Sequence, residues 1–78
     1  MIYYKGEFVK RDIGKAIHYF KLSSDQNDSE AQFYLGKIYY ENKDVPIDIN
    51  KAILYFKLSS NQNNSDSQYY LGLIFYEG

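Results

Sequence analysis

The chain of 78 residues contains no cysteine, and its ten acidic residues nearly balance its nine lysine and arginine residues. Without cysteine, the chain can form neither disulfides nor iron–sulfur or thiolate zinc sites. A formal net charge of −1 provides no basic field for a phosphate backbone, so we expect no nucleic-acid partner. The missing disulfides slightly favour the cytoplasm, although the secretory route stays open.

Long apolar runs are also missing. Residues 1–7 lack a basic start followed by a continuous apolar segment, so we predict no signal peptide, and no membrane span either. No segment alternates apolar and polar residues, which argues against β-strands. A glycine-rich loop that could hold phosphate is absent too.

What the chain does contain is a repeat of 36 residues. When residues 2–42 are aligned with residues 38–78, about 25 of the 41 pairs are identical and no gap is needed. Catalytic residues usually occur once, whereas almost every feature here occurs twice. The duplication therefore favours a structural or binding role over catalysis.

Each period predicts two helices. Apolar residues at spacings of three and four predict one helix type over residues 29–41 and 65–77. The same pattern predicts a second type over residues 12–26 and 48–62, joined to the first by turns at residues 6–11 and 42–47. We therefore predict an all-α chain, an α/α solenoid of antiparallel helix pairs.

Polar residues mark the expected helix ends. Ser29 and Gln32 predict a capping box at the start of the first helix type, and Ser65 and Gln68 repeat it. Further predicted caps are Asp12 and Asp48 at the starts of the second type, and Asn27 and Asn63, in the left-handed conformation, at its ends.

The predicted buried stripes and small contact positions also follow the repeat. The stripes comprise Ala31, Tyr34, Leu35 and Ile38 on the first helix type, and Ile13, Ala16, Ile17 and Phe20, with Ile49, Ala52, Ile53 and Phe56, on the second. We expect the small residues to make room for neighbouring Tyr and Phe rings; these are Ala16, Ala31, Gly36, Ala52 and Gly72.

Two motifs follow one another in the middle of the chain. They read Ala31-x-x-x-Leu35-Gly36-x-x-Tyr39 and Val45-x-x-Asp48-x-x-Lys51-Ala52-x-x-Tyr55. This pattern resembles the Sel-one-like repeat (SLR), a relative of the tetratricopeptide repeat, over essentially the whole chain. Serine replaces the expected alanine at Ser67.

The resemblance implies a division into repeats. Residues 1–28 would be a partial repeat (second helix), residues 29–64 a complete repeat, and residues 65–78 a partial repeat (first helix). Because the chain is phased in this way, we expect it to be a piece of a longer array.

The search for chemistry leaves no catalytic, metal or cofactor site to propose. His18 is the single histidine, its repeat partner is Leu54, and we interpret it as a partly exposed helix residue. Asp25, Asp28 and Glu30 cluster at one junction, but they lack the spacing of a calcium loop and are better explained as helix caps.

The aromatic residues are the best functional lead. On the first helix type, six side chains fall opposite the predicted stripe, where a solenoid tends to be concave and to bind peptides or helices. These candidate protein-binding residues are Phe33, Lys37, Tyr40, Tyr69, Leu73 and Tyr76.

Two functional interpretations remain. The first is a non-enzymatic interaction module, an adaptor or scaffold that presents a curved helical surface to a protein or peptide partner, as the SLR resemblance implies. The second is a purely structural spacer within a longer repeat protein, in which the aromatic rings pack between repeats.

Overall fold

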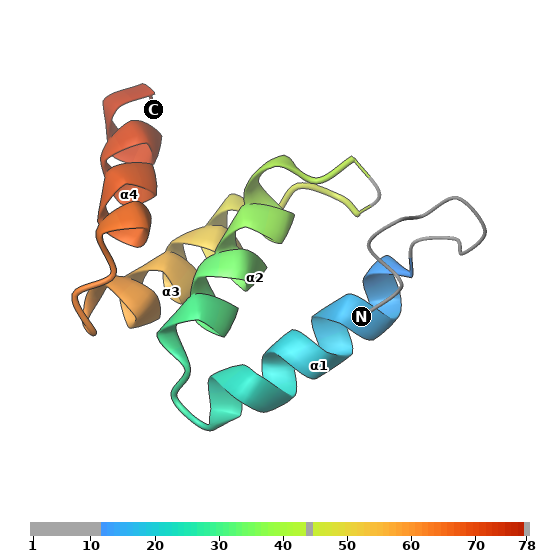
Figure 1. The fold of residues 1–78 in the computed structure, drawn as a ribbon. Coiled ribbons are helices and arrows are strands. Elements are labelled where there is room, and N and C mark those ends of the chain that lie inside the picture. Colours follow the sequence, from blue (N-terminus) through green and yellow to red (C-terminus); the bar gives the residue numbers. More distant parts are fainter. Residues whose placement is uncertain (1–11, 44, 78) are drawn as a thin grey trace.

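The computed structural model describes residues 12–43 and 45–77, which form four α-helices (Figure 1). The helices are α1 (Ile13–Asp25), α2 (Ser29–Glu41), α3 (Ile49–Ser60) and α4 (Ser65–Glu77). The described ranges contain no strand, and neighbouring helices pack on one another. The predicted all-α solenoid is therefore confirmed, while the predicted turn at residues 6–11 lies outside the described residues.

An aspartate caps the start of α1 and of α3, as predicted. Asp12 Oδ1 accepts a hydrogen bond of 3.0 Å from the amide of Lys15, and Asp48 Oδ1 accepts one of 3.1 Å from the amide of Lys51. Each carboxylate satisfies an amide that the first helical turn leaves without a partner. Hydrogen bonds between residues three positions apart therefore mark where α1 and α3 begin.

The capping residue predicted for α2 is wrong by one position. The helix does begin at Ser29, but the cap is Asp28, whose Oδ1 accepts from the amides of Glu30 at 2.9 Å and Ala31 at 3.2 Å. The amide of Ala31 and the hydroxyl of Ser23, which donates to Oδ2, hold the pKa of Asp28 below the usual range for aspartate. A charged acceptor beside these amides is a stronger cap than a serine hydroxyl.

The same correction applies to α4 and to the predicted capping boxes. Asn64 Oδ1 accepts from the amide of Ser67 at 2.9 Å, so Asn64 takes the role of Asp28. Gln32 does not turn back to its own helix start, because its Nε2 donates to the carbonyl of Ser24 at 3.4 Å and ties α2 to α1.

The ends of α1 and α3 agree with the prediction. Asn27 and Asn63 lie in the left-handed region with φ of 68° and 67°. Around Asn27, the amide of Asp28 donates to Ser23 O at 3.3 Å and the amide of Asn27 donates to Ser24 O at 2.8 Å. This pair of bonds is a Schellman motif, and it recurs one period later.

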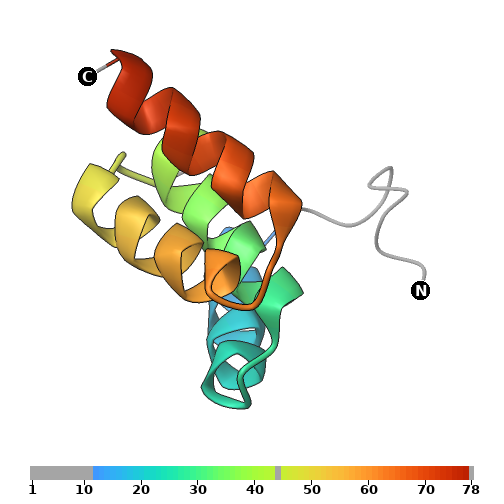
Figure 2. The same ribbon diagram turned by 90° about the vertical axis from the view of Figure 1, so that its left-hand side faces the viewer.

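The helices stand in a row in chain order. α2 packs most extensively on α3, α1 covers the other side of α2, and α4 packs on α3 with a smaller contact to α2. Figure 2 views this row from the α4 side. Within the described residues α1 and α4 do not touch, so they form the two ends of the row.

The hydrophobic core centres on Phe56 of α3, whose side chain is fully buried. A Cβ atom added to Gly36 would lie 2.6 Å from the Phe56 ring, which confirms that Gly36 makes room for that ring. The other buried members of this cluster are Leu35, Tyr39, Ala52 and Ile74. The predictions for Ile49 and Tyr34 are wrong, because their side chains are exposed.

The predicted stripe on α1 is only half-buried, and α1 has no fully buried residue. Its counterpart α3 is covered by helices on two sides, whereas in the described part of the chain α1 contacts α2 alone. The same sequence pattern is therefore buried more deeply on α3 than on α1.

Two buried serine hydroxyls have different surroundings. Ser59 Oγ donates to the carbonyl of Ser29 at 2.7 Å, which joins α3 to α2. Ser67 Oγ, equally buried, has no hydrogen-bond partner among the described residues. A buried hydroxyl without a partner costs about 1–3 kcal/mol, and Ala31 occupies the equivalent place in the preceding repeat.

We predict that Ser67→Ala raises the free energy of unfolding by about 1 kcal/mol, because it removes the unpaired hydroxyl. Urea denaturation followed by circular dichroism would measure the change. Ser59→Ala is the matched control and should lower the free energy of unfolding, because its hydroxyl is bonded. Equal effects of the two substitutions would contradict this account.

We also predict that Asp28→Asn reduces the loss of stability in acid. Because the pKa of Asp28 is lower in the folded state, its stabilising effect is present above about pH 4 and is lost as the pH falls through the folded pKa. Asparagine keeps the capping oxygen, as Asn64 does, but does not titrate. Urea midpoints measured from neutral to acidic pH should fall less in the variant than in the wild type, and parallel curves would refute the role of Asp28.

Candidate protein-interaction surface

The six candidate residues lie in two equivalent sets of three. Phe33, Lys37 and Tyr40 are half-buried on α2, and the same positions one repeat later are Tyr69, Leu73 and Tyr76 on α4. Tyr69 is 64% exposed and Tyr76 is 88% exposed, whereas Leu73 is half-buried. The structure therefore places equivalent side chains in different surroundings.

On α2, the two aromatic candidates pack between helices. The ring centroid of Phe33 lies 6.1 Å from that of Phe56 on α3 and 5.8 Å from that of Tyr70 on α4. Tyr40 contacts the same two rings, at 6.4 Å and 5.9 Å. These side chains join α2 to α3 of the same repeat and to α4 of the next repeat.

Tyr40 also has a polar contact with α4. Its hydroxyl donates to Glu77 Oε1 at 3.4 Å. Desolvation, and then the nearby Glu77 carboxylate, raise the pKa of Tyr40 above the usual range for tyrosine. The phenol is therefore neutral at physiological pH and acts as a donor.

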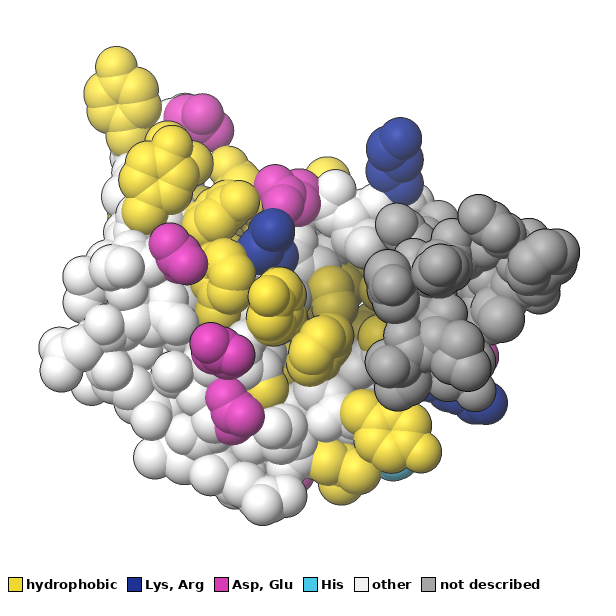
Figure 3. All heavy atoms as spheres, in the orientation of Figure 1, with side chains coloured by type: hydrophobic (Ala, Val, Ile, Leu, Met, Phe, Trp, Pro, Cys, Tyr) yellow, Lys and Arg dark blue, Asp and Glu magenta, His cyan; other side chains and the backbone are white. Residues whose placement is uncertain are grey.

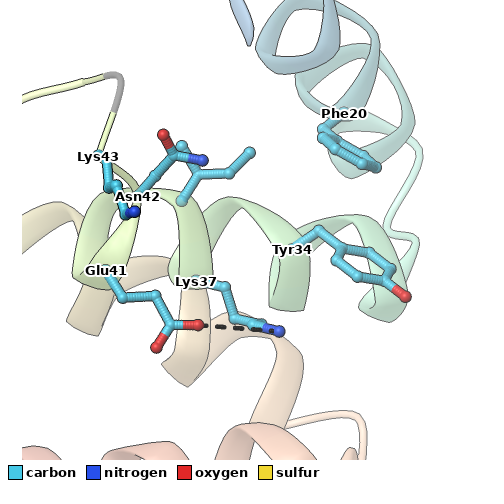
Figure 4. A pocket seen from close by; sticks show the side chains of 7 residues that line it. Phe20, Tyr34, Lys37, Glu41, Asn42 and Lys43 are labelled. Carbon is cyan, nitrogen blue, oxygen red and sulfur yellow. Dashed lines mark ion pairs between the residues drawn. The ribbon is translucent and has the colours of Figure 1, made fainter. Parts of the chain in front are cut away.

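Lys37 lies at the edge of a shallow open hollow between α1 and α2 (Figure 4). Its ammonium group lies 3.8 Å from Glu41 Oε2 and 5.7 Å from the centroid of Phe33. Phe20 and Tyr34 line the hollow, and their rings stack with centroids 5.4 Å apart. Among the described residues that line this hollow, Lys37 and Glu41 form an ion pair.

Hydrophobic side chains form a band over α4, α2 and α1 on the face seen in Figure 3. Successive ring contacts connect the three helices, with centroid distances between 5.3 and 5.8 Å. In order, these rings are Phe20, Tyr34, Phe33, Tyr70 and Tyr69.

On α4, the candidate protein-binding residues inferred from the sequence do not include Gly72 and Phe75. Gly72 was expected to face a neighbouring ring, and this is wrong for the described residues, because a Cβ atom added there would meet nothing within 4 Å. Phe75 is 65% exposed, whereas its equivalent Tyr39 is 9% exposed. Gly36 and Tyr39 on α2 contact α3. Adding the repeat period of 36 residues to their numbers gives Gly72 and Phe75, so the repeat would have identified both positions.

These residues belong to one exposed surface, which we call the α4 end face. Every member is exposed, and each is equivalent to a residue on the side of α2 that faces α3 and α4. The α4 end face consists of Ser65, Gln68, Tyr69, Gly72, Phe75 and Tyr76.

The contact of α2 with α3 shows what such a face can bind. Besides Phe56 against Gly36, the rings of Tyr39 and Tyr55 stack with centroids 6.1 Å apart and planes 9° apart. Hydrogen bonds flank these rings, from Ser59 Oγ to Ser29 O and from Gln62 Nε2 to Gln32 Oε1 at 2.9 Å. An α2-type face thus binds a helix through a glycine, an aromatic ring and two polar groups.

Within the described ranges, no group of three or more acidic, histidine or cysteine side chains could hold a metal ion. Asp28 of the acidic junction is engaged in capping, and the ring of His18 lies 5.2 Å from that of Tyr19. None of the helices in this part of the chain is long and apolar enough to span a membrane.

The row of antiparallel helices with a 36-residue period defines an α-helical repeat protein. The Sel1 repeat family model matches residues 1–28, 29–64 and 65–78, so the chain belongs to the Sel1 repeat family. This family is a non-catalytic helical repeat that generally mediates protein–protein interactions. Comparisons with curated proteins and with solved structures give no match.

The two glycines should respond in opposite ways to the same substitution. We predict that Gly36→Leu lowers the free energy of unfolding by more than about 1 kcal/mol, because the new side chain would collide with the Phe56 ring. Gly72→Leu should raise it by up to about 1 kcal/mol, because leucine is a better helix former and the site is open. Thermal and urea denaturation of both variants would test this, and unchanged melting of Gly36→Leu would exclude the close contact.

Proposed function

We propose that this chain is a non-catalytic interaction module that binds a helix of a partner protein on the α4 end face. The general role of Sel1 repeats in protein–protein interaction supports this proposal. The observation that carries it is the contrast between α2 and α4, since equivalent residues are packed on one helix and exposed on the other. Exposed aromatic rings grouped on one helix face are typical of binding surfaces.

The contact between α2 and α3 also specifies the chemistry of the partner helix. The helix should carry an aromatic ring to fit against Gly72, as Phe56 fits against Gly36. A second ring one residue earlier would stack on Phe75, as Tyr55 stacks on Tyr39. Such a helix would also need a serine to donate to a backbone carbonyl of α4.

All six candidate residues have a place in this proposal. Tyr69 and Tyr76 belong to the α4 end face, and Leu73 borders it. Phe33, Lys37 and Tyr40 are the equivalent residues on α2, where Phe33 and Tyr40 contact α4. We propose that the bound helix contacts the residues of α4 first.

The spacer interpretation is favoured by α2, where the rings of Phe33 and Tyr40 are already covered by Phe56 and Tyr70. On α4, Tyr69, Phe75 and Tyr76 are exposed in this chain. A further repeat would cover them under the spacer interpretation, whereas a partner helix would cover them under the binding interpretation.

The test uses a fluorescent peptide of residues 48–63, which contains α3 and both of its caps. We predict that it binds the intact chain and that Gly72→Leu weakens binding by about 10- to 100-fold, because the buried area of one phenylalanine is lost. Fluorescence anisotropy would measure the affinity. A peptide with Phe56→Ala should bind the wild-type chain similarly weakly.

Leu54→Glu in the intact chain is the matched control, since Leu54 is exposed on α3 and lies outside the α4 end face. It should bind the peptide as the wild type does. If the wild-type chain does not bind the peptide, or if Gly72→Leu binds it equally well, the proposed site is wrong and the spacer interpretation is preferred.

A further inference from the structure

Charge is divided between the two helix types of the repeat. Together, α2 and α4 carry four acidic residues and one lysine, whereas α1 and α3 carry four lysines and one aspartate. In Figure 3, acidic side chains border the band of hydrophobic side chains that runs over α4 and α2. One side of the row is therefore both aromatic and acidic.

The acidic residues recur with the repeat. Four residues of α2, spaced by three or four positions, share one face of the helix, and the four equivalent residues share the same face of α4. On each helix an aromatic residue lies between two acidic positions, which are about 16 Å apart along the helix axis. We call this set the acidic side face. It consists of Glu30, Phe33, Lys37 and Glu41 on α2, and of Asp66, Tyr69, Leu73 and Glu77 on α4.

This face lies along the side of the row and does not depend on which repeats precede or follow. α2 is packed against α1, α3 and α4, yet Phe33 and Lys37 are only half-buried and Glu41 is exposed. A further repeat would pack on α4 as α3 and α4 pack on α2, and it would leave the equivalent positions of α4 equally open. A longer array would therefore extend the acidic side face instead of covering it.

Lys37 shows which chemical group this face accepts. Its ammonium nitrogen lies 5.7 Å from the centroid of the Phe33 ring and 3.8 Å from Glu41 Oε2 (Figure 4). The cation is therefore attracted both by an aromatic ring and by a carboxylate. Leucine occupies the equivalent position on α4, so Glu77 lacks the lysine that Glu41 has one turn earlier on its own helix.

The carboxylates of the two helices come together near Tyr40. Glu77 Oε1 accepts a hydrogen bond of 3.4 Å from the Tyr40 hydroxyl. After desolvation and the effect of Glu77, the charge of Glu41 also raises the pKa of Tyr40. Two carboxylates therefore lie near one phenol, and Lys37 forms an ion pair with Glu41 of the two. A further cation at this place would offset the charge of Glu77.

We propose that the acidic side face binds a lysine- or arginine-rich segment of a partner protein. One basic side chain of the segment would lie over the Tyr69 ring and beside Glu77, in the arrangement that Lys37 has on α2. A second would pair with Asp66 at the other end of α4. The acidic side face shares only Tyr69 with the α4 end face, so this proposal goes beyond the binding of a helix there and is tested separately.

A reciprocal exchange at the equivalent positions 37 and 73 tests the proposal. The probe is a short fluorescent peptide of alternating lysine and glycine, and its affinity is measured by fluorescence anisotropy at low salt. Leu73→Lys should weaken binding because the new lysine would pair with Glu77. Lys37→Leu should strengthen binding because Glu41 loses its partner within the chain. Each change should be about 2- to 5-fold, the factor that corresponds to one exposed ion pair.

Two matched variants control for net charge. Leu54→Lys and Lys57→Leu make the same charge changes at exposed positions of α3, outside the acidic side face, and should bind the probe nearly as the wild type does. A probe with acetylated lysines should not bind. If the exchanges at positions 37 and 73 act no more strongly than their controls, or if the acetylated probe binds equally well, the proposal is overturned.

Gly72→Leu separates this site from the helix-binding site. It blocks the α4 end face but should leave the affinity for the basic probe unchanged, because Gly72 lies outside the acidic side face. Loss of probe binding in this variant would place the probe on the α4 end face and would overturn the proposal. Absence of probe binding to the wild type at up to about 1 mM would also overturn it, whatever the result with the peptide of residues 48–63.

Discussion

The fold depends on the contact between the Phe56 ring and Gly36. The ring is fully buried, and it reaches α2 only because position 36 has no side chain. The same ring contacts Phe33, Tyr40 and Tyr70, so a single side chain of α3 joins three helices. A glycine inside a helix costs about 1 kcal/mol relative to alanine, and the burial of a complete phenylalanine offsets that cost.

Local polar chemistry sets the helix ends around this contact. Asp12, Asp48, Asp28 and Asn64 each accept hydrogen bonds from the first turn of a helix, and Asn27 takes the left-handed conformation that ends one. Such bonds connect residues that are two to five positions apart, so they recur wherever the sequence recurs. The repeat of the sequence therefore produces a repeat of helix lengths and junctions.

The repeat does not produce equal burial, because burial depends on neighbours. In the described residues α2 and α3 are covered on two sides, while α1 and α4 are each open on one. A helical repeat buries its apolar face against the next unit, and the exposed face of α4 carries residues equivalent to those that α2 buries against α3. This connects the architecture with the proposed binding of a helix at α4.

The sequence alone was sufficient for the helices, the family and most of the helix ends, since spacings of three and four and short-range caps depend on nearby residues. It also indicated the close contact at Gly36. It did not distinguish Asp28 from Ser29 as the cap of α2, because either side chain could accept the same amide hydrogen bonds. For the six candidate residues, it identified the helix positions but not their surroundings.

Only the tertiary structure decided which rings are packed and which are exposed. Tyr39 and Phe75 occupy equivalent positions, yet one stacks on Tyr55 and the other faces solvent. Gly36 and Gly72 are identical in sequence, yet one is filled by a ring and the other is open. The periodic sequence determined what each helix can bind, whereas the place of each helix in the row determined whether that contact is made, because burial requires a neighbour that periodicity alone does not supply.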